Sequence, residues 1–210
     1  MGAGKTTVGR SLAQRTGLRF IDSDHEIERR RHASVSEIFA SDGEAGFRDL
    51  EQQVLDELTL EPGVVLATGG GAVLREPNRR ALHQRGTVVY LRAGPDELAH
   101  RMRNDRSRPL LRGVDPRARL RELFRQRDPL YREVAHFTIE TGRPSPAMLT
   151  QLVLAQLELA GVLDDAAGDG ACARRRDPAR ALLQCASLPA RLPRPRAHEQ
   201  CSRRTRFALL

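Results

Sequence analysis

The sequence predicts an α/β fold in which a parallel sheet lies between layers of helices. Four short apolar runs, typical of buried strands, fall at 18–22, 62–71, 86–92 and 136–141. Helical patterns separate them, and strands that alternate with helices form parallel sheets through right-handed crossovers. Ligands of such sheets bind at the carboxyl ends of the strands, so the residues after each run are candidates for a site.

The helical segments begin and end at recognisable signals. Gly17 follows the first pattern, and Ser34 and Glu37 have the spacing of a capping box. Helices are expected at 5–16, 24–31, 34–41, 45–60, 78–84, 95–104, 116–126 and 146–160.

The length of 210 residues favours one domain, which we place at 1–164. No stretch approaches eighteen consecutive apolar residues, and no apolar run follows the basic N-terminus, so neither a membrane span nor a signal peptide is expected. The three cysteines all lie after position 171. A body without cysteine needs no disulfide and fits a reducing compartment, so we expect a cytoplasmic protein.

The segment 165–210 is expected to be a disordered tail rich in Arg, Ala and Pro. It holds ten Arg and four acids, which leaves about +2 of the net charge of +8 for the rest of the chain. The charge is therefore not spread over a folded face, and nucleic acid is not an expected partner. An arginine-rich arm that touches RNA is the alternative, but only Phe207 is aromatic there. The cysteine spacing has no CxxC pair and does not favour zinc.

Lys5 is the single lysine of the sequence, and it stands in "GAGKTT". This stretch is typical of the end of a phosphate-binding loop, GxxxxGK[ST]. The backbone of Gly2, Ala3 and Gly4 would surround phosphate oxygens, the ammonium would contact the β and γ phosphates, and the hydroxyls of Thr6 and Thr7 follow at a helix N-terminus that favours anions. A glycine-rich N-terminus without function is the alternative.

The phosphate-binding motif begins in mid-loop. Its first glycine would lie five positions before Gly4, upstream of Met1, and the strand that should precede it is also absent from the sequence. One interpretation is that the true start lies upstream and Met1 is an internal methionine. The other is a damaged copy. We favour the first, because the rest of the site is intact.

Two further motifs follow predicted strands. In "FIDSDHEIE", Asp22 and Asp24 are one residue apart, so both should point to one face, where one would orient Mg²⁺ and the other would take a hydroxyl proton. Helix capping by Asp24 is the alternative. In "ATGGGAVL", Gly69, Gly70 and Gly71 permit a ligand to approach bare backbone, and a plain tight turn is the alternative.

Taken together with "DGEAGFRDLE" at 42–51, "RPLL" at 108–111 and "RDPLY" at 127–131, these motifs resemble those of shikimate kinases in order and spacing. The resemblance covers about 160 residues. It implies a three-layer α/β/α P-loop kinase fold with a lid and five parallel strands, of which this sequence would contain four, the first and central one being absent.

The resemblance also implies transfer of the ATP γ-phosphate to the 3-hydroxyl of shikimate, in the pathway to chorismate and the aromatic amino acids. The expected partners are ATP, shikimate and Mg²⁺, without nucleic acid or membrane, and the expected state is a monomer. Lys5 would contact phosphates, Thr6 would bind Mg²⁺ with Asp22 in support, and Asp24 would hold the acceptor hydroxyl as candidate base.

Four arginines receive roles by the same resemblance. Arg48 and Arg127 would bind the substrate carboxylate beside the Gly69–Gly71 backbone, Arg108 would be the lid arginine over the phosphates, and Arg143 would face the adenine. Paired guanidinium groups suit a small carboxylate because each can bind it through two hydrogen bonds. In a chain this rich in arginine, each one alone is more often a solvated residue, and the segment 103–121 is either a lid or an exposed loop.

Two rival functions stay open at this point. One is another small-acceptor kinase, such as a gluconate kinase. The other is a remnant that binds a nucleotide or a partner without catalysis, because loss of a central strand would leave ladder groups unpaired.

Overall fold

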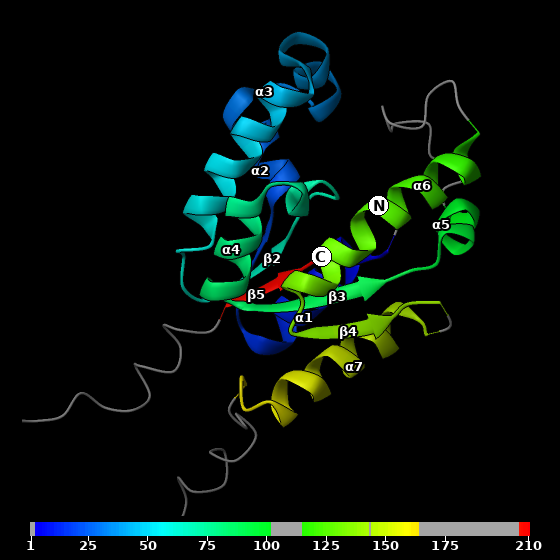
Figure 1. Cartoon of the computed structure of the whole chain (residues 1–210). Coiled ribbons are helices and arrows are strands. Elements are labelled where there is room, and N and C mark those ends of the chain that lie inside the picture. The colour runs from blue at the N-terminus through cyan, green and yellow to red at the C-terminus, as the bar shows by residue number, and fades with distance from the viewer. Residues whose placement is uncertain (1–2, 102–114, 143, 164–205) are drawn as a thin grey trace, which may run out of the picture.

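A computed structural model of the chain describes residues 3–101, 115–142, 144–163 and 206–210. Within these residues, five parallel strands form one sheet in the order β1-β2-β5-β3-β4 (Figure 1). The bounds are β1 Arg19–Asp22, β2 Val64–Ala67, β3 Thr87–Arg92, β4 Phe137–Glu140 and β5 Arg206–Leu209. The predicted parallel α/β sheet is therefore confirmed.

Helices lie on both faces of the sheet, as Figure 1 shows. Their bounds are α1 Lys5–Thr16, α2 Ser23–Arg31, α3 Val35–Leu58, α4 Glu76–Arg85, α5 Pro95–Arg101, α6 Pro116–Val134 and α7 Pro146–Leu159, with a short 3₁₀ helix, η1, at Ala72–Leu74. In the described part of the chain, no helix is long and apolar enough to cross a membrane.

The core divides into two apolar clusters, one on each face. The first joins α1 and α7 to the sheet, with Leu12 and Val153 fully buried. The second joins α2, α3, α4 and α6 to the opposite face, with Leu55 and Val88 fully buried. Aliphatic residues make up most of both clusters, together with the buried aromatic residues Phe47, Tyr90 and Phe207.

Two helices differ from their predicted bounds. The two helices expected at 34–41 and 45–60 are one element, α3, with a bend at Gly43, where φ is 70°. The predicted capping box is present at its start, since Ser34 and Glu37 bond to each other's backbone amides. Helix α6 continues to Val134 through Pro129, although a proline inside a helix usually ends it. Contacts of the neighbouring Asp128 with β3 hold this part of α6 in place.

The expectation that the central strand is absent and that the whole segment 165–210 is a tail is wrong for residues 206–210. Residues 206–209 form β5, which lies between β2 and β3. The apolar run "FALL" is short and ends a segment rich in Arg and Pro, so its pattern did not indicate a strand. Because β5 pairs on both edges, the unpaired ladder expected for the remnant does not occur. Residues 164–205 lie outside the described part.

Candidate functional site

The predicted phosphate-binding loop lies at the start of α1. Gly4 is the N-cap of this helix and has a φ of 85°, a left-handed conformation that favours glycine. Lys5 is the first residue of the helix and lines a cavity of about 60 Å³, which Arg127 also lines. Ala3 borders the same cavity, and Thr7 is exposed. Gly2 lies outside the described residues.

The predicted metal ligands meet in space. The hydroxyl of Thr6 donates to Oδ2 of Asp22 over 3.1 Å, although the two residues are 16 positions apart. Magnesium usually keeps one or two protein oxygens and completes its shell with water and phosphate oxygens, so a hydroxyl and a carboxylate beside the phosphate loop fit it. Among the described residues, no group of three or more His, Cys, Asp or Glu side chains is placed to hold a metal by itself.

The two aspartates do not share a strand face, and this expectation is corrected. Strand β1 ends at Asp22, and Asp24 lies in the first turn of α2. Asp22 caps that helix by accepting a hydrogen bond from the backbone amide of Asp24 over 3.1 Å. The capping role considered for Asp24 thus belongs to Asp22, and the side chain of Asp24, which is partly exposed, points elsewhere.

Asp24 reaches the glycine loop. A Cβ placed on Gly69 would lie 2.5 Å from Oδ1 of Asp24 and 2.9 Å from Oε1 of Glu51. Only a residue without a side chain fits between these carboxylates. The backbone amide of Gly69 also donates to the hydroxyl of Ser23 over 3.1 Å, and Ser23 is fully buried. The loop is therefore held against the start of α2.

Arg48 approaches the same loop from α3. Arg48 is 8% exposed, and its guanidinium forms an ion pair with the fully buried Glu51, with 2.7 Å between Nη1 and Oε2. Glu44 lies 3.3 Å from Nη2. A Cβ on Gly71 would overlap the guanidinium, so a side chain at this position would displace Arg48 from its ion pair. The structure shows the protein's own charged side chains against these glycines, and the approach of a ligand to their backbone stays a prediction.

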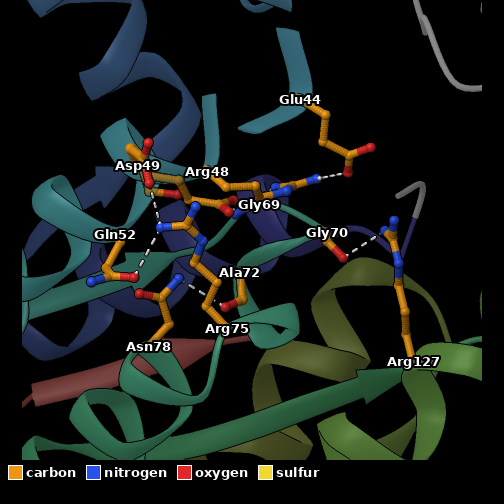
Figure 2. A network of polar contacts seen from close by, with 12 residues as sticks. Glu44, Arg48, Asp49, Gln52, Gly69, Gly70, Ala72, Arg75, Asn78 and Arg127 are labelled. Carbon is orange, nitrogen blue, oxygen red and sulfur yellow. Dashed lines mark hydrogen bonds and ion pairs between the residues drawn. The ribbon is translucent and has the colours of Figure 1, made fainter. Parts of the chain in front are cut away.

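Arg127 approaches from α6, and Figure 2 shows Gly70 between Arg48 and Arg127. Nη1 of Arg127 donates to the Gly70 carbonyl over 2.7 Å, and the Tyr131 hydroxyl donates to the same oxygen over 2.6 Å. Arg127 is 8% exposed. Tyr131 stacks on Tyr90 with 4.8 Å between ring centroids, which ties α6 to β3.

Side chains of α3 and α4 also hold the residues that follow the three glycines. Asn78 donates from its side-chain amide to the Ala72 carbonyl over 3.0 Å, and Arg75 pairs with Asp49 over 2.7 Å (Figure 2). Arg75 also donates to Gln52. These contacts fix η1 between α3 and α4. The segment that directly follows the glycines is therefore held in one position.

Electrostatics at the loop are set by burial. Burial raises the pKa of Glu51, and the neighbouring Asp24 charge acts in the same direction, while Arg48 and Arg127 oppose it. Burial also raises the pKa of the Tyr131 hydroxyl, which therefore stays a hydrogen-bond donor. Oε1 of Glu51 and the Nε atoms of both arginines are buried and make no hydrogen bond within the described protein. One donor of each guanidinium therefore has no partner among the described residues.

The structure brings together most of the predicted site residues. Thr6 meets Asp22, Lys5 shares a cavity with Arg127, and Asp24, Arg48 and Arg127 all meet the Gly69–Gly71 loop. Arg108 and Arg143, with most of the segment 103–121, lie outside the described residues.

Three residues of the site were not assigned a role from the sequence: Ser23, Glu51 and Tyr131. Glu51 and Tyr131 stand in the motifs "DGEAGFRDLE" and "RDPLY", so the motifs pointed to them. Nothing in the spacing of Ser23 indicates that it binds the Gly69 amide.

Known proteins similar to this chain are shikimate kinases. The family model described as shikimate kinase matches residues 1–158. Curated shikimate kinases of Ralstonia nicotianae and Burkholderia pseudomallei are 62% and 60% identical over 163 residues, which is 78% of this chain and 86% and 89% of theirs.

Two solved structures of shikimate kinases have a similar fold. A shikimate kinase from Acinetobacter baumannii in complex with shikimate is 52% identical with a TM-score of 0.74, over 78% of this chain and 91% of that one. The enzyme of Bacteroides thetaiotaomicron is 35% identical with a TM-score of 0.70, over 75% and 94%. The family match over residues 1–158 and relatives that are about 60% identical show that this chain belongs to the shikimate kinase family.

Proposed function

We propose that this chain transfers the γ-phosphoryl group of ATP to the 3-hydroxyl of shikimate with Mg²⁺ bound, as a step of aromatic amino acid biosynthesis. We further propose that it acts as a monomer in the cytoplasm, with small molecules as its ligands rather than nucleic acid or membrane. Kinase chemistry on an alcohol comes with the family. The nucleotide, the metal and the residue roles are the parts that need support.

The observation that carries the proposal is the arrangement of Arg48 and Arg127 around the glycine loop. Arg48, from α3, lies against Gly71. Arg127, from α6, donates a hydrogen bond to the Gly70 carbonyl. Both are buried, and a buried guanidinium interacts strongly with a carboxylate because water screens it little. A small organic acid bound there would be oriented by its carboxylate, which fixes the position of its hydroxyls.

The phosphate side of the site rests on Lys5 and the amino end of α1. Backbone amides of the first helical turn have no partner within the helix, and the helix dipole favours an anion there. Bound Mg²⁺ would neutralise charge on the phosphates, held by Thr6 and Asp22. Arg108 and Arg143 are proposed as the lid and adenine-facing arginines.

The transfer needs few groups from the protein. The oxygen of the acceptor hydroxyl attacks the γ-phosphorus, the bond from that phosphorus to the β–γ bridging oxygen breaks, and ADP leaves with the electron pair. Asp24 receives the hydroxyl proton. Its carboxylate lies against Gly69 and next to Glu51, and Glu51 neutralises Arg48 rather than taking part in the transfer.

A coupled assay of ADP release tests the proposal, with ATP, Mg²⁺ and either shikimate or gluconate as acceptor and mass spectrometry of the product. We expect a phosphorylated product from shikimate and none above background from gluconate. Phosphorylation of gluconate alone would favour the rival kinase. A folded chain that binds ATP and phosphorylates neither acceptor would favour the non-catalytic remnant.

A further inference from the structure

The central strand of the sheet comes from a part of the chain beyond the residues that the family model matches. That match ends at residue 158, and β5 begins at Arg206. We infer that residues 206–210 are a working part of the kinase, because they complete its sheet and hold both loops of its site. This inference goes beyond the proposed function, since it concerns a segment to which that function assigns no role.

The first support is pairing on both edges. On one side, β5 pairs with β2 in register from Val64 with Arg206 to Ala67 with Leu209. On the other side, it pairs with β3. The ladder extends to Leu210, whose amide donates to the Val89 carbonyl over 3.0 Å. Without β5, the inner edges of β2 and β3 would carry unpaired backbone groups inside the core, which is costly.

The second support is burial on both faces. Phe207, Ala208, Leu209 and Leu210 are 1%, 4%, 0% and 2% exposed. Phe207 and Leu209 pack in the cluster with α1 and α7, whereas Ala208 and Leu210 pack in the cluster on the opposite face. A strand that contributes alternately to both apolar layers is a part of the core rather than an added edge.

Arg206 fixes the register at the amino end of the strand. Its Nε donates to the Glu61 carbonyl over 2.9 Å, and its Nη2 donates to the Leu60 carbonyl over 2.8 Å. These carbonyls follow the end of α3. A shift by one residue would break both bonds and would turn the apolar side chains to the wrong layers.

The strand also connects to the site. The Leu209 carbonyl accepts from the backbone amide of Thr68, over 3.1 Å, and Thr68 directly precedes the glycine loop. A Cβ on Gly9 of α1 would lie 3.1 Å from Cδ1 of Leu209, so the helix that carries Lys5 rests on this side chain. Leu210 lines the cavity that Lys5 and Arg127 share. The glycine loop and the predicted phosphate-binding loop therefore both contact β5 or the residue that follows it.

Two leucine substitutions in the full chain test this dependence. Leu209→Asp places a charge at a fully buried position of β5, and Leu159→Asp makes the same change at the end of α7, where the side chain is 83% exposed. We expect Leu209→Asp to lower the melting temperature by about 10 °C or more and Leu159→Asp to change it by less than about 3 °C. Equal melting temperatures for Leu209→Asp and the unchanged chain would overturn the inference.

Hydrogen exchange of the unchanged chain tests the placement of β5 without any substitution or substrate. We expect the backbone amides of residues 207–210 to exchange as slowly as those of β2, within about tenfold, because both lie in the centre of one sheet. Exchange of 207–210 at the rate of an unstructured peptide, with β2 protected, would overturn the inference whatever the chain phosphorylates. Protection of both strands without kinase activity would instead count against the proposed function alone.

Discussion

Arg127 donates a hydrogen bond from Nη1 to the carbonyl oxygen of Gly70 over 2.7 Å, across 57 positions of the sequence. The same oxygen accepts from Tyr131, one helical turn further along α6. Two donors of one helix thus hold a single carbonyl. They attach the middle of the glycine loop, which is the proposed substrate-binding loop, to α6.

Tyr131→Phe should loosen this loop. The substitution removes one of the two donors to Gly70 and keeps the ring that stacks on Tyr90, so about 1 kcal/mol of positioning is lost. We expect the KM for shikimate to rise about fivefold while the KM for ATP stays unchanged. Tyr90→Phe is the matched control, because its hydroxyl bonds Asp128 rather than the loop. An equal change in both variants would argue against a positioning role for Tyr131.

Arg127→Ala should weaken shikimate binding strongly. It removes a buried guanidinium that lies beside the glycine loop, and we expect the KM for shikimate to rise about 50-fold or more. Arg132→Ala is the control, since this exposed arginine of the same helix pairs with Asp128. Steady-state kinetics with shikimate varied at saturating ATP give the comparison. An unchanged KM would remove Arg127 from the substrate site.

Asp24→Asn should separate binding from turnover. The amide keeps the size of the side chain against Gly69 but cannot take the hydroxyl proton, so we expect kcat to fall about 100-fold or more while ATP binding is spared. Asp96→Asn makes the same change at an exposed ion pair on α5. Equilibrium titration with ATP and single-turnover kinetics measure the two effects. Normal turnover in Asp24→Asn would discard the base role.

Acid should destabilise the fold partly through Glu26. Hydrogen bonds from Arg29 lower the pKa of this carboxyl from 4.5 to about 2, burial opposes the shift, and Arg30 lowers the pKa further. Because the folded-state pKa is the lower one, the stabilisation is present above pH 4.5 and is lost as the pH falls towards 2. Glu26 and its arginine partners lie near the surface, so we expect them to contribute about 1 kcal/mol to the free energy of unfolding.

Urea unfolding at pH 6 and pH 3 checks this with Glu26→Gln as the comparison. The variant has no carboxyl to titrate, so its free energy of unfolding should fall less between the two pH values than that of the unchanged chain. The same fall in both proteins would show that Glu26 does not contribute to acid sensitivity.

The sequence predicted the architecture because local signals and motifs agreed. Four apolar runs became β1 to β4, and the capping box at Ser34 begins α3 as expected. The resemblance to shikimate kinases predicted that Asp22 supports Thr6 and that Arg48 and Arg127 lie beside the glycines, and the structure brings these residues together.

What failed depended on contacts between distant segments. Strand β5 has only four residues, and its partners β2 and β3 are more than a hundred positions away, so no local pattern marks it as central. The continuation of α6 past Pro129 is decided by packing on β3 rather than by propensity. Ser23 was missed for the same reason, since its hydroxyl meets an amide 46 positions away.

The most direct test of the account compares shikimate with its methyl ester as acceptor. The ester keeps the ring and the hydroxyls but has no carboxylate for Arg48 and Arg127. We expect kcat/KM to fall about 100-fold or more for the ester. Equal values for the acid and the ester, or no phosphorylation of either by the folded chain, would contradict the claim that two buried arginines orient an organic acid for phosphoryl transfer.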